Sequence, residues 1–234
     1  MKKSLAALAA LALPLSLAVA GVPAHAATPT ACTGVSGCKI VTSSDIDGDT
    51  RNDSVGVAST GLKDDLWGVG SITVRVRTAT GRVMQTTGSE VDWYDTPYQG
   101  VAAIDGVKGN EIVVGDTAGA HALQFRVITV RSGQLVSLSP PTGSSLTRSS
   151  RWATDGSYSY QMGWSRTVSP KGKVTLTRKL AERQGSQKHN GQTNTYEWKS
   201  NKWVKASTKK VVYRSDKSAY AIGGWHIRGV RVFP

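Results

Sequence analysis

The sequence predicts an all-β protein built from antiparallel hairpins. Several short runs alternate apolar and polar residues, which is the pattern of strands with one buried face. Polar or glycine-containing turns separate these runs, and no stretch shows a helical period of useful length. We therefore expect a meander of strands rather than a helical or mixed fold.

Three hairpins are the clearest predicted elements. In each of them a short turn joins two runs that can share one buried face. In the third hairpin we expect Tyr196, Trp198 and Trp203 to lie on the same face. The predicted arms are residues 71–77 with 82–84, 125–130 with 134–138, and 193–198 with 202–206.

Residues 1–26 have the features of a secretory signal peptide. A basic start precedes an uncharged run rich in Ala and Leu, and Ala24-His25-Ala26 closes the segment as a cleavage site. A retained membrane anchor is the alternative, but the A-x-A triplet argues against it. No later segment is apolar enough to span a bilayer. We expect a secreted protein, extracellular or associated with the cell wall, without a transmembrane segment in its mature form.

The only cysteines are Cys32 and Cys38. An even count in an exported protein implies a disulfide, which would pin the N-terminal entry to the fold. A two-cysteine metal site is the rival interpretation. No histidine or second cysteine pair lies nearby in the sequence to complete such a site.

Charge divides the mature chain into two regions. Residues 27–139 carry a net charge of −3, whereas residues 140–234 carry +14. The linker-like segment 140–145 coincides with this change, so it either separates two lobes or forms a long turn in one compact domain. The basic half suits a polyanionic partner. A solvated face that keeps the protein soluble is an equally good explanation.

An acidic stretch near the mature N-terminus has the pattern of a calcium loop. Calcium binds six to eight oxygens from carboxylates, backbone carbonyls and water. Four aspartates on alternate or nearly alternate positions can converge on one ion if the backbone curls tightly. The predicted ligands are the side chains of Asp45, Asp47, Asp49 and Asp53 and the backbone carbonyl of Arg51.

The details of this stretch exclude an EF-hand. That loop requires Gly at its sixth position and Glu at its twelfth, where this chain has Thr50 and Gly56. Gly48 instead supplies the residue that tolerates a positive φ where the curl is sharpest. The alternative to a calcium site is a solvated turn rich in aspartate.

A weak internal repeat supports a structural role for this loop. Residues 47–53 align without gaps on residues 105–111, and both copies precede short apolar strands. Ala103 and Val107 replace two of the predicted ligands in the second copy. We expect the second copy to keep the turn without the ion.

The first copy resembles the FG-GAP/VCBS repeat of integrin-type β-propellers. The resemblance covers the pattern D-x-D-G-D-x-x-x-D over residues 45–53, followed by a strand; Thr50 stands where the repeat usually has Gly. It implies that the aspartates bind calcium and that the N-terminal part is built like propeller blades. The chain is too short for a complete propeller, which needs four or more blades. The layout also resembles small secreted actinobacterial proteins with one such repeat.

Two classes of function remain open. The basic half interleaves Trp and Tyr with Lys and Arg, which favours non-catalytic binding of an anionic polysaccharide or cell-wall polymer. Many of these aromatic residues are expected in the core. No RRM, KH or helix-turn-helix pattern favours nucleic acid.

The alternative is a hydrolase acting on an extracellular polymer. His121 is the candidate base and Asp116 its conceivable orienting carboxylate, although no G-x-S-x-G or H-E-x-x-H motif occurs. His189 lies in a polar segment where we expect it to be exposed.

Overall fold

The computed structural model describes residues 28–61, 69–93, 96–141 and 150–232. The predicted signal peptide and most of the predicted linker at 140–145 lie outside these residues. The elements of the described residues, in chain order, are β1 (Cys38–Ser44), β2 (Asp53–Thr60), β3 (Val69–Arg77), β4 (Val83–Asp92), β5 (Tyr98–Ala102), β6 (Glu111–Ala118), β7 (Ala122–Arg131), β8 (Gln134–Ser137), β9 (Trp152–Gly156), β10 (Tyr160–Val168), β11 (Val174–Arg183), β12 (His189–Lys199), β13 (Lys202–Tyr213), α1 (Asp216–Tyr220) and β14 (Gly224–His226).

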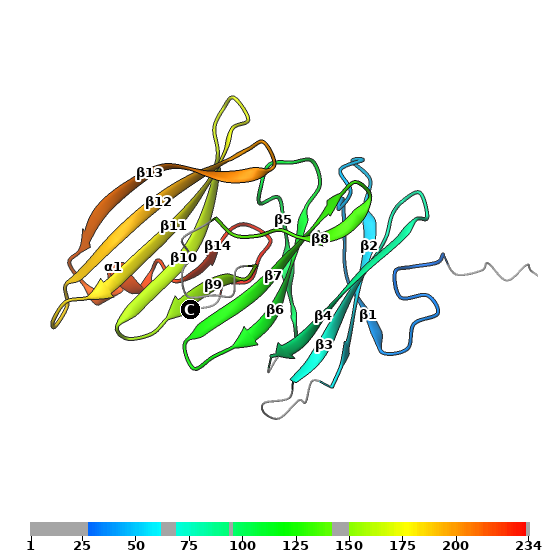
Figure 1. Cartoon of the computed structure of the whole chain (residues 1–234), viewed down its shortest axis with the longest axis horizontal. Helices are drawn as coiled ribbons and strands as arrows, with labels where there is room; N and C mark the ends of the chain where they lie inside the picture. The colour runs from blue at the N-terminus through cyan, green and yellow to red at the C-terminus, as the bar shows by residue number, and fades with distance from the viewer. Residues whose placement is uncertain (1–27, 62–68, 94–95, 142–149, 233–234) are drawn as a thin grey trace, which may run out of the picture.

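All the strands belong to one open sheet (Figure 1). Its main path runs β1-β2-β3-β4-β6-β7-β9-β10-β11-β12-β13, while β5 pairs with β6, β8 with β7 and β14 with β10. Most neighbours are antiparallel; β14 is parallel to β10, and β4 meets β6 through the parallel pair Asp92 and Thr117. The sheet does not close into a barrel. The predicted all-β class is therefore confirmed, and the open sheet is consistent with the expectation that the chain does not form a complete propeller.

The three predicted hairpins are present as β3–β4, β7–β8 and β12–β13. Ser132 and Gly133 both have positive φ, and so do Ser200 and Asn201. Two residues with positive φ form the turn whose twist matches that of paired antiparallel strands. Trp198 and Trp203 are direct partners across the third hairpin, as the alternation predicts.

One hydrophobic core joins the acidic and basic halves of the chain. A single cluster of buried residues extends from Ile46 in the first half to Trp225 and Val230 in the second. Pairing of β7 with β9 continues the sheet across the same boundary, and Phe125 lies opposite Trp152 there. The change of charge along the chain therefore does not coincide with a break in the core.

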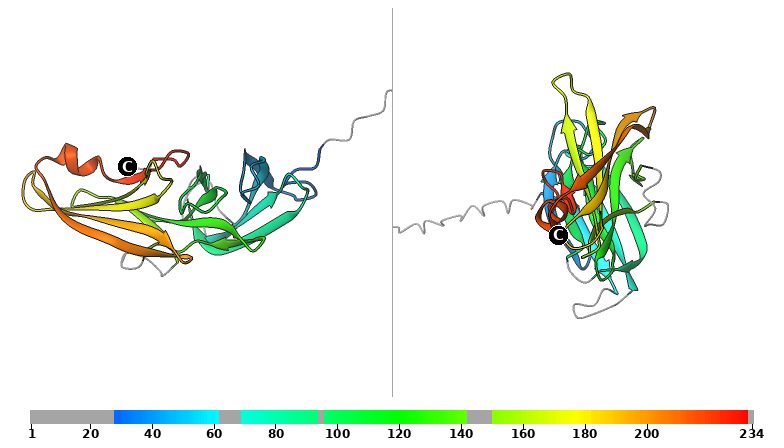
Figure 2. Two further views of the ribbon diagram at one scale, coloured as in Figure 1. Left: turned by 90° about the horizontal axis from the view of Figure 1, so that it is seen from above. Right: turned by 90° about the vertical axis from the view of Figure 1, so that its left-hand side faces the viewer.

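Two features anchor the ends of the sheet. Cys32 and Cys38 form the predicted disulfide, which packs so closely on Gly56 of β2 that a Cβ there would lie 2.5 Å from the sulfur of Cys32. At the other end, α1 packs on the strands β10–β13, where Ala219 and Ile222 bury against Ala181 (Figure 2). Sequence periodicity missed α1 because it is only five residues long.

Candidate metal loop and ligand cleft

Residues 45–53, which we call loop 1, connect β1 to β2 in a tight curl. Gly48 and Thr50 both adopt positive φ, at 84° and 70°. The carboxylate of Asp45 accepts the N–H of Gly48 at 2.7 Å and that of Thr50 at 3.0 Å. Thr50 thus takes a backbone conformation that glycine adopts more easily, so the chain tolerates the departure from the usual repeat.

Three carboxylates of loop 1 converge. Oxygen atoms of Asp45, Asp47 and Asp49 all lie within 4.8 Å of one another, close enough to hold one metal ion. Burial raises the pKa of Asp47 above its usual value, and the neighbouring charges of Asp53, Asp49 and Asp45 raise it further. A divalent cation would relieve this repulsion. The donor set, made of carboxylate oxygens, fits a hard cation.

The Arg51 side chain lies beside this group. Its guanidinium pairs with Asp49 at 2.6 Å and lowers the pKa of that carboxyl. The predicted ligand at this position is the backbone carbonyl of Arg51, which this ion pair leaves unengaged. Its role as a ligand stays a prediction.

Asp53 is fully buried and accepts hydrogen bonds from the backbone of loop 1. One of its oxygens accepts the N–H groups of Ile46 and Asp47, at 2.9 and 3.2 Å, and the other accepts that of Ala79 at 3.0 Å. The structure therefore ties loop 1 to the β3–β4 turn through Asp53. Asp53 lies outside the group of three convergent carboxylates, and its role as a metal ligand stays a prediction.

Residues 103–111, which we call loop 2, repeat part of this geometry between β5 and β6. Gly106 has a φ of 83°, matching Gly48. The N–H of Ile104 donates to Glu111 at 2.5 Å, as that of Ile46 donates to Asp53. Strands β2 and β6 begin at these equivalent acids and have equal lengths. The internal repeat is thus a repeat of structure.

A guanidinium occupies loop 2. Arg131 pairs with the buried carboxylate of Asp105 and also donates to the hydroxyl of Thr129 at 2.7 Å. The same hydroxyl donates to Glu111 at 3.0 Å. Burial raises the pKa of Glu111 to about 7, and the charge of Asp105 adds to that rise. Loop 2 therefore balances its carboxylates with a cation from its own chain and a partly protonated acid.

The two loops contact each other directly. Asn110 of loop 2 donates its backbone N–H and its side-chain amide to the carbonyl of Asp45, at 2.9 and 3.0 Å. Gly109 lies against the carbonyl of Ile46, so closely that a Cβ there would come within 2.4 Å of the oxygen. Loop 2 buttresses the curl of loop 1.

A cleft of about 860 Å³ opens between the β7–β8 and β12–β13 hairpins. Trp198 and Trp203 form one side, with ring centroids 5.0 Å apart and planes nearly perpendicular. The guanidinium of Arg131 lies 5.9 Å from the Trp198 ring, and Lys202 and Lys205 complete the lining. The cleft thus combines aromatic surface with positive charge.

Four of the ten aromatic residues that the structure describes in the basic half are core residues, four are partly buried, and Tyr158 and Tyr220 are exposed. Trp152, Trp164 and Trp225 are fully buried, and Tyr196 nearly so. Trp198 and Trp203 are only partly buried, because they pack on the core with one side and line the cleft with the other. These two indoles are the aromatic groups that can meet a ligand there.

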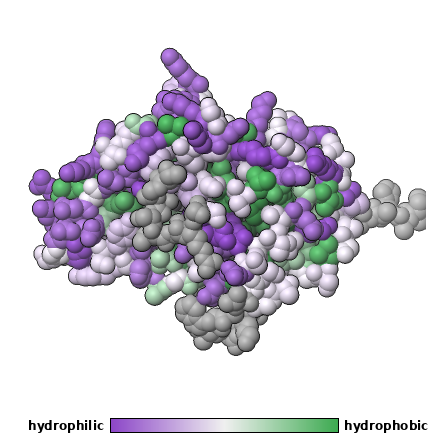
Figure 3. Space-filling view, in the orientation of Figure 1, coloured by the Kyte–Doolittle hydropathy of each residue, from purple (hydrophilic) through white to green (hydrophobic). Residues whose placement is uncertain are grey.

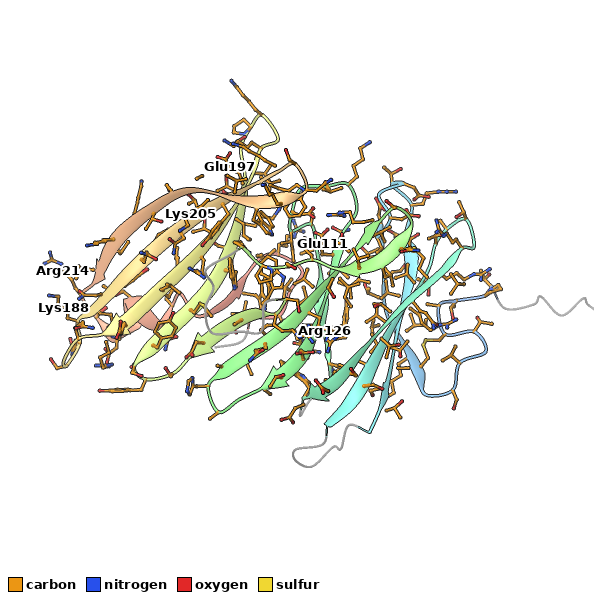
Figure 4. All side chains as sticks on the ribbon, viewed as in Figure 1. Glu111, Arg126, Lys188, Glu197, Lys205 and Arg214 are labelled. Atoms are coloured by element: carbon orange, nitrogen blue, oxygen red, sulfur yellow. A yellow bond between two sulfur atoms is a disulfide. The ribbon has the colours of Figure 1, made fainter. Side chains whose placement is uncertain are left out.

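The lysines of the cleft have no ion-pair partner among the residues that the structure describes. Within the described residues, neither Lys202 nor Lys205 forms an ion pair, whereas Lys173 and Lys199 both pair with Glu197. Hydrophilic side chains cover much of the β10–β13 part of the sheet on the face shown in Figure 3. Figure 4 shows Lys188, Lys205 and Arg214 on this part, and Glu111 and Arg126 nearer the middle of the molecule. The lysine side chains of the β10–β13 part of the sheet are therefore exposed to solvent.

The candidate base, His121, has a different partner from the one suggested by sequence. Its Nδ1 lies 3.1 Å from both carboxylate oxygens of Asp155, which is buried, while the His121 side chain is 54% exposed. Asp116 is instead engaged by Arg126 and Arg151. The expectation that Asp116 orients His121 is wrong, because two guanidinium groups compete for it.

The expectation for His189 is also wrong. This residue is fully buried, and its Nε2 lies 2.9 Å from Asp216 of α1. The edge of its ring faces Tyr220. A polar local sequence suggested exposure, but α1 folds back over the strand and covers the imidazole. His189, the first residue of β12, therefore packs against α1 and is not a surface group.

Sequence reasoning missed Asp155, Arg131 and Glu111 as partners in these clusters. Asp155 is 34 residues from His121, and no local pattern connects them. The alignment of residues 105–111 on 47–53 did contain Glu111 as the equivalent of Asp53. The sequence offers one signal for Arg131: loop 2 contains the acids Asp105 and Glu111 and was expected to bind no ion, so a cation from elsewhere in the chain was needed to balance them.

No family model, no curated protein and no solved structure matches this chain. In the described part of the chain, no helix has the length and apolar character needed to cross a membrane.

Proposed function

We propose that this protein is an exported, calcium-stabilised binding protein for an anionic glycan polymer, such as a cell-wall or extracellular polysaccharide. Export is supported by the signal-peptide pattern of residues 1–26 and by the disulfide between Cys32 and Cys38. Binding is supported by the distribution of charge and aromatic surface in the basic half.

The cleft is the observation that carries the proposal. Indole faces stack on sugar rings, and ammonium groups pair with phosphate or carboxylate substituents. The cleft contains both kinds of group, from Trp198, Trp203, Lys202 and Lys205. Its volume of about 860 Å³ lies in the usual range for ligand sites. Both lysines are exposed, and neither forms an ion pair with the residues that the structure describes.

The second part of the proposal is that calcium binds loop 1 and stabilises the fold. The convergence of Asp45, Asp47 and Asp49 supports a hard divalent cation, and the repeated loop geometry supports a relation to the FG-GAP/VCBS repeat. Bound calcium would neutralise the loop and stabilise its curl. Asp53 would hold the loop backbone in either case through its three accepted N–H groups.

Retention on immobilised polyanions tests the binding function. A variant with Lys202, Lys205, Lys209 and Lys210 replaced by Gln should elute from a polyuronate or teichoic-acid column at clearly lower salt than the wild type. The matched control replaces four exposed cations elsewhere on the same half and has the same net charge: Lys179, Lys188, Arg214 and Lys217. Equal loss in both variants would reduce the interaction to net charge alone, and no retention of the wild type would overturn the proposal.

A hydrolase remains the second candidate, and the pair formed by His121 and Asp155 favours it. A buried carboxylate at Nδ1 leaves Nε2 exposed to accept a proton from water or a substrate hydroxyl. His121→Ala and Asp155→Asn should then abolish release of reducing ends from the polymer, while His226→Ala should not. Turnover that survives His121→Ala would eliminate this candidate.

A further inference from the structure

Trp198 lines two depressions rather than one. One is the cleft described above. The other is a smaller depression of about 340 Å³, which we call the rim pocket, between loop 2 and the tips of the β10–β11 and β12–β13 hairpins. Its lining includes Gly106 of loop 2 and Val174 of β11, which touch. Because both depressions share Trp198, a chain-like ligand can pass from one to the other over its indole.

Charge in the rim pocket is arranged around one carboxylate. Glu197 is held by Lys173 at 2.6 Å and by Lys199 at 2.7 Å, and these two ammonium groups lower its pKa. Both lysine side chains are more than half exposed. Asp105 also lies in this lining, but it is neutralised by Arg131. Two accessible cations therefore converge on a single exchangeable anion.

We infer that the cleft and the rim pocket form one track for a linear anionic glycan, and that Glu197 holds the place of a ligand anion between Lys173 and Lys199. This inference rests on the proposed function and extends it to the length of the ligand and to an internal competitor. Figure 4 shows Glu197 of β12 at the rim of the sheet and Lys205 on the neighbouring strand β13. Lys202 and Lys205 would bind charges of the polymer before it crosses Trp198, and Lys173 and Lys199 after it.

The chemistry of the track favours a glycan over nucleic acid. Its exposed cations are lysines, which act as point charges and bind sulfate, phosphate or carboxylate without the planar fork of arginine. The guanidinium of Arg131 already donates hydrogen bonds to Asp105, Thr129 and the carbonyl of Val130. The partly buried indole of Trp198, which lines both depressions, suits a sugar ring stacked on it.

The first test removes the internal competitor. Glu197→Gln keeps the size of the side chain and releases both lysines, so its affinity for a polyuronate oligomer should rise about three- to fivefold. Glu182→Gln is the matched control, because Glu182 is an exposed acid on the neighbouring strand β11 and its loss gives the same net charge. Equal gains in the two variants would overturn the role of Glu197.

The second test measures the length of the track. Affinity for uronate oligomers from about two to about eight sugars should rise by more than tenfold once one chain spans both depressions, because the second contact becomes intramolecular. Trp198→Leu should remove this step while leaving the affinity for the shortest oligomer within about twofold. Thermal unfolding of Trp198→Leu checks that the hairpin stays folded, and Trp198→Phe is measured beside it. A smooth dependence on length in the wild type would overturn the two-part track.

The outcomes separate this inference from the proposed function. Oligomers of sugar phosphates tested beside polyuronates show which anionic group is preferred, and duplex DNA tests whether sugar stacking matters. Binding that is weakened by the four β13 substitutions but unchanged by Glu197→Gln would overturn the track and keep the proposed function. Tighter binding to DNA than to either glycan would overturn both.

Discussion

Loop 1 and loop 2 share a central glycine turn and an acid at the start of the following strand, and they contact each other, yet they compensate their negative charge differently. In loop 1, Asp45, Asp47 and Asp49 lie close together, and the exposed guanidinium of Arg51 pairs with Asp49. In loop 2, Ala103 and Val107 take the places of two of these aspartates, and a guanidinium reaches the remaining buried acid, Asp105. Loop 2 thus carries an internal counter-charge, whereas loop 1 has a cluster of carboxylates that could hold a metal ion.

The internal cation ties loop 2 to the rest of the molecule. Arg131 lies at the end of β7, contacts Asp105 of loop 2 and approaches the ring of Trp198 in β12. Gly106 of the same loop packs on Val174 of β11. Loop 2 therefore bridges the two halves of the sheet, whereas loop 1 rests on loop 2 and on the β3–β4 turn.

The largest expected difference between the loops comes from removing their arginines. Arg131→Met strands the buried carboxylate of Asp105 beside Glu111, so the free energy of unfolding at neutral pH should fall by about 3 kcal/mol. Arg51→Met is the matched control, because Arg51 makes an exposed ion pair and its loss should leave the urea midpoint unchanged. Urea unfolding of both variants measures the contrast. Equal, small effects would mean that Arg131 is not the counter-charge of loop 2.

The second expected difference is the response to calcium. If loop 1 binds calcium as proposed, a concentration of 100 times the dissociation constant should stabilise the protein by about 2.7 kcal/mol. Thermal unfolding with calcium and with chelator measures this, and Asp49→Ala should abolish the shift. An unchanged midpoint in the wild type would reduce residues 45–53 to an acidic turn and would remove the support for the FG-GAP/VCBS relation.

These loops also show how far the sequence could be interpreted alone. Alternation and turn residues predicted the hairpins and the all-β class, because strand faces and turns are encoded within a few residues. Spacing placed Asp45, Asp47 and Asp49 together for the same reason. The contacts of Arg131 with Asp105 and of His121 with Asp155 join residues 26 and 34 positions apart. Such pairs depend on sheet register and on burial, which no local pattern encodes.

The third difference is in pH dependence. Glu111 in loop 2 has a pKa of about 7 in the folded protein, against a usual value of 4.5, so the folded state binds more protons than the unfolded chain between these pH values. Stability should therefore fall as the pH rises through this range, by up to about 1.4 kcal/mol per pH unit. Glu111→Gln should flatten this slope in urea titrations, and Glu182→Gln should not. An unchanged slope in Glu111→Gln would assign the effect to another group.

The smallest expected effect, and the most direct test of the comparison, converts loop 2 into loop 1. In an Asp49→Ala background, which silences loop 1, the substitutions Ala103→Asp and Val107→Asp restore the missing carboxylates, and Arg131→Met removes the internal cation. Calcium should then raise the stability of this variant by about 1 kcal/mol, measured by thermal unfolding. The same variant with Arg131 retained should not respond, because the guanidinium still holds Asp105. A response with Arg131 present would mean that the guanidinium does not occupy the position of the ion, whereas no response in either variant would mean that the shared glycine turn is insufficient for binding.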